Sequence, residues 1–176
     1  MNCEYLLDAN IYIQAWEFQF PEPVFPGFWE WFQANHQSGR IRTIDKVVQE
    51  LQKHASSAIC AWVKENAISV DTSDEAITEA YIRVIKAAQS RVLKNGRVYT
   101  QDAIAEFGRV ADSFLIASAS VHNTTLVTWE TPNDQQTSKV YIPDITNLLN
   151  IKIITTPKLL LELRPRFTWE KPADSN

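Results

Sequence analysis

The sequence lacks several features that mark common protein classes. Cys3 and Cys60 are its only cysteines; they do not have metal-ligand spacing and are too few for a disulfide framework, so we expect buried, reduced thiols. No apolar run approaches the ~18 residues of a membrane span. Glu4 and Asp8 interrupt the apolar stretch of residues 1–20, which is therefore unlike a signal peptide. These absences predict a soluble, cytoplasmic protein without a membrane segment.

An excess of positive charge is also missing. Lys and Arg number 17 against 21 Asp and Glu, giving a net charge of -4, which argues against binding nucleic acid through overall charge. A nuclease remains open, because an acidic metal site adds negative charge that bound cations reverse locally. Internal repeats and Gly/Ser linkers are absent from the sequence too. We expect one domain over residues 1–168 and a frayed polar tail at 169–176.

Apolar runs of strand length alternate along the chain with longer segments of helical periodicity. Strands are expected at 4–7, 41–43, 68–70, 125–129 and 151–155. Helices are expected at 26–37, 46–54, 57–66, 74–93 and 113–122, with short ones at 143–150 and 158–163. Thr72 and Glu75 have capping-box spacing before the longest helix. This order predicts an α/β fold with a mostly parallel sheet, which binds ligands beyond the carboxyl ends of its strands.

Two acids stand where a ligand site is expected. Asp8 directly follows the first strand in EYLLDAN, although Asp8 or Asn10 could equally cap the next helix. Asp112 shares one helical face with Leu115 and Ile116, so it is expected to point toward the core. Capping is the alternative for Asp112 as well, but a cap alone does not require inward placement.

Further polar residues are candidates for the same place. Glu50 borders an apolar stripe, and taken alone it fits a solvated position beside neighbouring lysines. Glu130 ends a buried-looking strand, and Thr128 faces the same way two residues earlier. Asp134 is near enough to substitute or assist, although beside Pro132 it also suits an ordinary turn.

A cluster of carboxylates at the rim of a sheet has a common physical purpose. Their mutual repulsion is relieved by hard divalent cations, which prefer oxygen ligands, so Mg²⁺ or Mn²⁺ is expected. Zinc is disfavoured, because His36, His54 and His122 are scattered and are expected at the surface or at helix ends. Carboxylate-bound magnesium suggests phosphodiester hydrolysis.

In four short motifs the sequence resembles the PIN domain family of metal-dependent ribonucleases. The family's opening strand with Asp-x-Asn is matched by LLDAN, its helical Glu by VVQEL, its Ala-Asp helix by ADSFLIASA, and its strand ending in Thr-x-acid by LVTWE. A PIN-like branch long classed as a domain of unknown function is similar in PGFWEWF, IDKVVQEL, ADSFLIASA and YIPDITNLL. Order and spacing match over almost the whole chain.

The resemblance implies a three-layer α/β/α sandwich with a central, mostly parallel sheet, and an endoribonuclease that attacks RNA with a metal-activated water. It implies that Asp8 and Asp112 are primary metal ligands, that Glu50 completes the first site or orients the water, and that Glu130 serves a second ion. Most PIN domains have Asp at this last position, where Glu130 has a longer arm. Supporting polar groups would be Asn10 and Thr128.

The resemblance also suggests partners. Many bacterial relatives are VapC-type toxins held inactive by an antitoxin, so an antitoxin is a hypothesis here. Basic residues near Glu50 or at the end of the long helix are candidates to guide the RNA backbone, although solvated surface is the ordinary alternative. These residues are Arg40, Arg42, Lys46, Arg91, Lys94 and Arg97.

The aromatic stretch FPGFWEWFQ has helical spacing, which favours core packing over base stacking. Phe25, Phe28, Trp29 and Phe32 form its stripe. Trp31 lies off the stripe and is a candidate for contact with a second protomer or an antitoxin.

Two rival functions come from other classes. One is an inactive PIN-like scaffold that binds RNA or a protein, against which the complete acid set argues. The other is an aspartyl phosphatase with Asp8 as nucleophile, but that chemistry wants a second Asp where this chain has Asn10.

Overall fold

The computed structural model describes residues 3–168, so the tail expected at 169–176 lies outside the described residues. Within this range five strands form one sheet: β1 (Tyr5–Leu7), β2 (Ile41–Ile44), β3 (Ser69–Val70), β4 (Thr125–Val127) and β5 (Ile153–Ile154). Their order is β3-β2-β1-β4-β5, and each neighbouring pair is parallel. The sheet confirms the prediction of an α/β fold.

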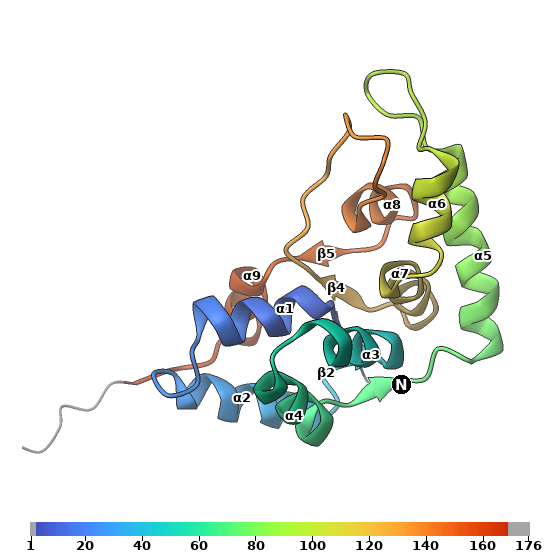
Figure 1. Ribbon diagram of the computed structural model, residues 1–176. Coiled ribbons are helices and arrows are strands. Elements are labelled where there is room, and N and C mark those ends of the chain that lie inside the picture. The colour runs from blue at the N-terminus through green and yellow to red at the C-terminus, as the bar shows by residue number, and fades with distance from the viewer. Residues whose placement is uncertain (1–2, 169–176) are drawn as a thin grey trace, which may run out of the picture.

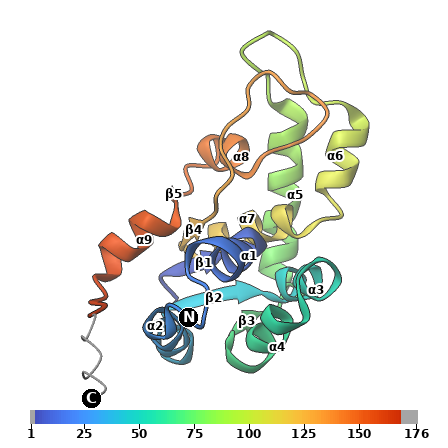
Figure 2. The ribbon, with the colours of Figure 1, turned by 60° about the vertical axis from the view of Figure 1, so that its left-hand side comes forward.

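The connections between strands are helical. The helices are α1 (Ala9–Gln14), which continues into the π-helical turn η1 (Ala15–Gln19), α2 (Pro26–Gln37), α3 (Asp45–His54), α4 (Ser57–Asn66), α5 (Glu75–Ser90), α6 (Gln101–Phe107), α7 (Ala111–His122), α8 (Ile142–Leu148) and α9 (Thr156–Leu163). Figures 1 and 2 show α5 to α8 on one side of the sheet and α2 and α4 on the other. Strands are added on one side of β1 as far as β3 and on its other side from β4 on, and right-handed crossovers then place the two sets of connecting helices on opposite faces of the sheet.

The reversal between β1 and β4 defines where a ligand fits. In open parallel sheets a crevice opens at the carboxyl ends of the two strands where the order reverses, since their connecting helices leave toward opposite faces. Leu7 pairs in register with Val127, so the residues that follow β1 and β4 are neighbours at this edge. The topology therefore brings residues 8 and 128 together.

The core explains why these segments take these forms. The strands supply fully buried apolar side chains, and α7 is packed against both β2 and β4. Leu115 and Ile116 of α7 are fully buried, as their shared face with Asp112 predicted. No helix among residues 3–168 is long and apolar enough to cross a membrane.

Several element boundaries differ from the expected ones. Helix α5 ends at Ser90, because Val92 and Val98 pair in a short antiparallel bridge around a turn in which Gly96 has a φ of 74°. The predicted capping box is wrong: Asp74 caps α5 through Ala76 N, while the Thr72 hydroxyl donates to Asp45. Helix α6 was not predicted, because seven residues are too few to establish a period.

The cysteines and histidines are placed partly as expected. Cys3 and Cys60 are free thiols, Cys3 buried and Cys60 half-buried. Burial raises the pKa of Cys3 to about 11. His36 was expected at the surface or at a helix end. It lies at the end of α2 but is fully buried beside Tyr12, and burial lowers the pKa of its imidazole to about 3.

Candidate active site at the carboxyl edge of the sheet

Asp8 lies at the crevice between β1 and β4, held by a compact set of hydrogen bonds. The Thr128 hydroxyl donates to Asp8 Oδ2 at 2.7 Å, and Asn10 Nδ2 donates to the same oxygen. Asn10 Nδ2 also lies 3.0 Å from Thr128 Oγ1, and its Oδ1 accepts from the Trp129 backbone N–H. Asp8 stands at the N-cap position of α1, but its carboxylate is bonded across the sheet edge. The contacts of Asn10 and Thr128 orient this carboxylate.

The environment of Asp8 makes its charge costly. The residue is 4% exposed. Burial raises the pKa of Asp8 to about 7; the Thr128 hydrogen bond opposes this rise, and the charges of Glu130 and Glu50 add to it. A buried carboxylate with its pKa near neutrality is a recognised mark of a functional site.

Asp112 lies in the first turn of α7 and is half-buried. Burial raises its pKa well above the ordinary value, and the charges of Asp8, Glu130 and Glu50 raise it further. Asp112 also lines a hollow on this side of the molecule. Asp8 and Asp112 each feel the charge of Glu50 and of Glu130, so chain segments more than a hundred residues apart share one electrostatic field.

Glu50 and Glu130 border the same region from different elements. Glu50, on α3, is half-buried, and burial raises its pKa against the lowering effect of His54. Glu130 follows β4, and both of its carboxylate oxygens are engaged. Lys139 Nζ lies 2.7 Å from Glu130 Oε1, and the Ile142 backbone N–H donates to Oε2 at 2.8 Å. Lys139 is a neighbour of the acids that no sequence motif singled out.

A hollow of about 270 Å³ opens beside these acids. Its walls come from α3, α6, α7 and the segment before α8, and they include Glu50, Asp112 and Lys139. Glu106 of α6 adds a further carboxylate, which was missed because α6 itself was not foreseen. Asp112 is reached from solvent through this hollow.

The four acids have the type of ligand atom that a hard divalent cation prefers, but their side chains are not gathered around one point. All four offer oxygen donors, and their mutual repulsion would be relieved by positive charge. Yet among residues 3–168 no three His, Cys, Asp or Glu side chains are gathered closely enough to hold a metal ion. The engagement of Glu130 with Lys139 and Ile142 is one physical reason.

The remaining predicted residues lie apart from Asp8. Asp134 forms ion pairs with Arg91 at 2.6 Å and with Lys94 at 2.8 Å. Arg91 also lies 3.6 Å from the buried Asp144, and Arg97 lies 3.4 Å from Thr137 Oγ1. Because its carboxylate pairs with these cations, Asp134 joins the loop after β4 to the segment after α5.

The basic residues expected to guide RNA separate into two groups. Arg40 pairs with Glu4 at 2.7 Å before β1 and β2 begin, which is the edge of the sheet opposite Asp8. Arg42 is half-buried and lies against Gly39 at the same end. Lys46 is instead on α3 near Glu50, with its ammonium 4.2 Å from the centre of the Phe114 ring. Of these three, Lys46 alone is near the acids.

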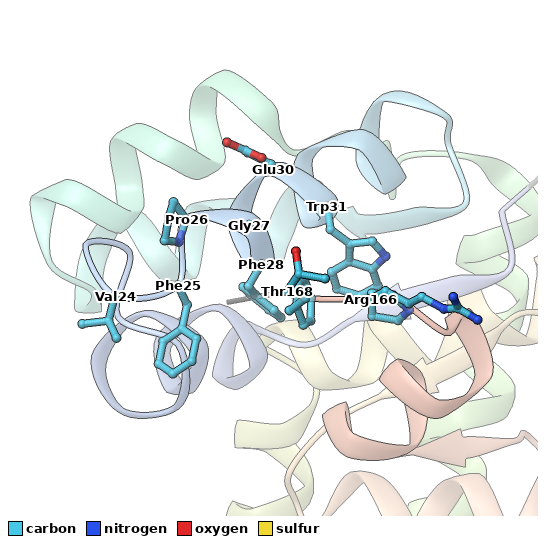
Figure 3. Close-up of a pocket in the computed structure, with 11 residues that line it drawn as sticks. Val24, Phe25, Pro26, Gly27, Phe28, Glu30, Trp31, Arg166 and Thr168 are labelled. Carbon is cyan, nitrogen blue, oxygen red and sulfur yellow. The ribbon is translucent and has the colours of Figure 1, made fainter. Parts of the chain in front are cut away.

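A second hollow, of about 660 Å³, lies beside the start of α2, and none of the four acids lines it. Figure 3 shows its walls, with Glu30 pointing away from the cavity. Phe28, Trp29 and Phe32 are buried as predicted, whereas Phe25 precedes the helix and is 41% exposed. Trp31 is half-buried and packs edge-on against Phe167, with ring centres 6.2 Å apart.

Comparison with solved structures identifies the class of fold. A chain of VapBC2 from Rickettsia felis, determined with a DNA fragment from their promoter, is similar over 86% of this chain and 97% of that one, with 14% identity and a TM-score of 0.53. A chain of VapBC-5 from Mycobacterium tuberculosis, a member of the VapBC family of toxin-antitoxin systems, is similar over 88% and 98%, with 15% identity and a TM-score of 0.42. The first likeness confirms the fold of a PIN-like domain.

The family follows from the sequence itself. A family model described as a domain of unknown function, DUF4411, matches residues 5–167. The chain belongs to this family, which confirms the resemblance to a PIN-like branch of unknown function. A search of the curated proteins gives no match.

Proposed function

We propose that this chain is a metal-dependent endoribonuclease that hydrolyses RNA phosphodiesters at the Asp8–Asp112 crevice. The observation that supports the proposal is a buried carboxylate, Asp8, where the strand order reverses, and a half-buried one, Asp112, that feels its charge; burial and neighbouring acids raise the pKa of each. Burying charges that repel one another costs free energy. A scaffold that only binds RNA or protein has no need to keep such an arrangement.

The positions of the acids suggest a separate role for each in the reaction. Asp8, fixed by Thr128 and Asn10, and Asp112, fixed on α7, would hold Mg²⁺ or Mn²⁺. A bound ion of this kind lowers the pKa of a coordinated water and stabilises charge on a phosphate. Glu50 borders the hollow with a raised pKa and is suited to accept the proton of the attacking water.

Glu130 and Lys139 would respond to the substrate. In the structure they neutralise each other at 2.7 Å. Lys139 lines the hollow and so can turn toward a phosphate oxygen, which would free the Glu130 carboxylate for a cation. Lys139 then supplies positive charge to the developing transition state.

The test compares cleavage of a mixed RNA pool by purified protein with Mn²⁺. The variant is the Asp8→Asn, Asp112→Asn double, and its matched control is Asp71→Asn, Asp102→Asn, which removes two exposed acids. We expect the site double to lose at least ~10³-fold in rate, or about 4 kcal/mol of transition-state stabilisation, and the control to cleave as wild type does.

Two results would count against the nuclease. Equal cleavage by wild type and by the site double would mean a contaminating enzyme. Wild type that binds RNA but leaves it intact with Mn²⁺ would favour the scaffold. Calorimetric titration with Mn²⁺ gives an independent reading, because the site double should lose binding that the control retains.

We also propose that the chain acts as the toxin of a toxin-antitoxin pair. The exposed apolar side chains that line the second hollow support it: Val24 is 68% exposed, Phe167 is 48% exposed and Phe25 is 41% exposed, as suits a surface that a protein partner covers. Induced expression in a bacterial host should arrest growth, and the site double should not. Equal growth of cells expressing either form would contradict a toxic activity.

A further inference from the structure

A groove of about 220 Å³ separates α3 from the start of α7 and is distinct from the acid-lined hollow. Cationic and neutral side chains dominate its walls. They are Lys46, Gln49, Glu50, Lys53 and His54 from α3, and Arg109, Val110 and Ala111 around the first turn of α7.

The cations of this groove are available to a ligand. Lys53 and Arg109 are exposed, and Lys46 is held against the Phe114 ring. In the part of the chain that the structure describes, the ion pairs involve none of these three. Three full positive charges therefore face one carboxylate, that of Glu50, in a protein whose net charge is -4.

The groove is continuous with the proposed catalytic hollow. Glu50 and Val110 line both cavities, so the two adjoin and a strand long enough to leave one can reach the other. One cavity is acidic, with Asp112, and suits a cation with its bound phosphate. The other is basic and suits an anion. A polymer with a negative charge on every repeating unit can place one charge beside the cation in the acidic hollow and the next in the basic groove.

We infer that the groove between α3 and α7 binds phosphate groups of the RNA strand beside the scissile bond, through Lys46, Lys53 and Arg109. The inference rests on the proposed function and adds the path that the strand takes. Contacts of this kind are electrostatic and independent of base sequence, so they position the strand without selecting a site. His54 offers a further donor at the groove's outer end.

Binding in EDTA isolates this groove from catalysis. The fluorescence anisotropy of a short, labelled, single-stranded RNA is measured at several salt concentrations for three proteins. These are wild type, the groove double variant Lys53→Ala/Arg109→Ala and the control double variant Lys64→Ala/Arg83→Ala. Both doubles remove one exposed lysine and one exposed arginine, the control pair from α4 and α5. The thermal midpoint of each confirms folding.

We expect the groove double to weaken binding at least about tenfold at low salt. The slope of log K against log salt should shrink by about 1.4, because each phosphate contact on a single strand contributes about 0.7. The control double should keep the wild-type slope. A Lys53→Arg, Arg109→Lys variant, which retains both charges, should bind close to wild type.

The outcomes separate this inference from the proposed function. If wild type cleaves the same RNA with Mn²⁺ while both doubles bind alike, the groove is not the path of the strand and the nuclease stands. If wild type neither binds nor cleaves RNA, the proposed function fails and the groove assignment fails with it.

Discussion

Two regions of the molecule are dense in unusual side chains, and they act on stability in opposite directions. Around α2, aromatic rings pack on one another, with Phe32 stacked on Trp62 at 5.4 Å and Phe28 on Phe20 at 4.1 Å. This packing removes large apolar surfaces from water. At the carboxyl edge of the sheet, Asp8 is buried and Asp112 half-buried, and the two acids repel each other.

The difference shows which kind of region marks function. The aromatic cluster has an adequate explanation in folding alone, since it stabilises the native state. The acid pair raises the free energy of the native state, and it persists only if something outside the chain's own packing compensates it. A cation with a phosphate ligand is such a compensation.

The largest expected effect comes from the stabilising region. Phe32→Ala should lower the free energy of unfolding by about 3 to 5 kcal/mol, because Phe32 is 1% exposed and its ring touches several others. Urea denaturation followed by tryptophan fluorescence measures it. Mn²⁺ binding by the folded variant should be unchanged, because the cluster holds none of the acids.

Phe25→Ala is the matched control for that change. Phe25 belongs to the same aromatic stretch but is 41% exposed, so we expect a loss within about 1 kcal/mol. Equal losses from both variants would show that burial does not separate the two rings. Loss of Mn²⁺ binding in folded Phe32→Ala would show that the two regions are coupled.

The acid region should give the opposite sign. Metal-free Asp8→Asn should be more stable than wild type at pH 8, by about 2 kcal/mol. The pKa of Asp8 rises from 3.8 to about 7, which corresponds to a destabilisation of about 4 kcal/mol when the carboxylate is charged. Asparagine removes this cost, but its hydrogen bonds are weaker than those of a carboxylate, so the net gain in stability is smaller. Chemical denaturation in EDTA checks the value.

The pH dependence follows from proton counts. Between about pH 4 and pH 7 the unfolded chain has lost the Asp8 proton while the folded chain keeps it, so wild-type stability falls as pH rises through this window. Below pH 4 both states are protonated and the advantage of Asp8→Asn should vanish. An advantage that is independent of pH would exclude the buried charge as its cause.

The sequence predicted the arrangement of the sheet better than the closure of the site. Asp8 directly follows β1 and Asp112 lies in the first turn of α7, positions that strand ends and helical periodicity determine locally. The engagement of Glu130 by Lys139 and Ile142 was not predicted, since it depends on how the segment before α8 folds back over β4. The periodicity of apolar residues predicts helices and strands but does not predict contacts between segments that are distant in the sequence.

The basic residues show the same limit. Lys46 was singled out together with Arg40 because both precede Glu50 in the chain. The strand β2 lies between them, and it carries Arg40 to the amino edge and Lys46 to the carboxyl edge. Arg109 stood unremarked beside Asp112, although the first turn of a helix that presents a site residue also presents its neighbours.

The smallest expected effect concerns the contact that covers Glu130. Lys139→Met should tighten Mn²⁺ binding about fivefold at fixed pH. The change removes a positive charge that repels the cation, an effect of about 1 kcal/mol for charges a few ångströms apart in water, and it frees the Glu130 carboxylate. Calorimetric titration measures the change. Lys94→Met is the control, since it removes an equal charge from the Asp134 pair and should leave binding as it was. If Lys139→Met binds Mn²⁺ no more tightly than wild type, Glu130 lies outside the metal's field, and the acids that hold the cation reduce to Asp8, Asp112 and Glu50.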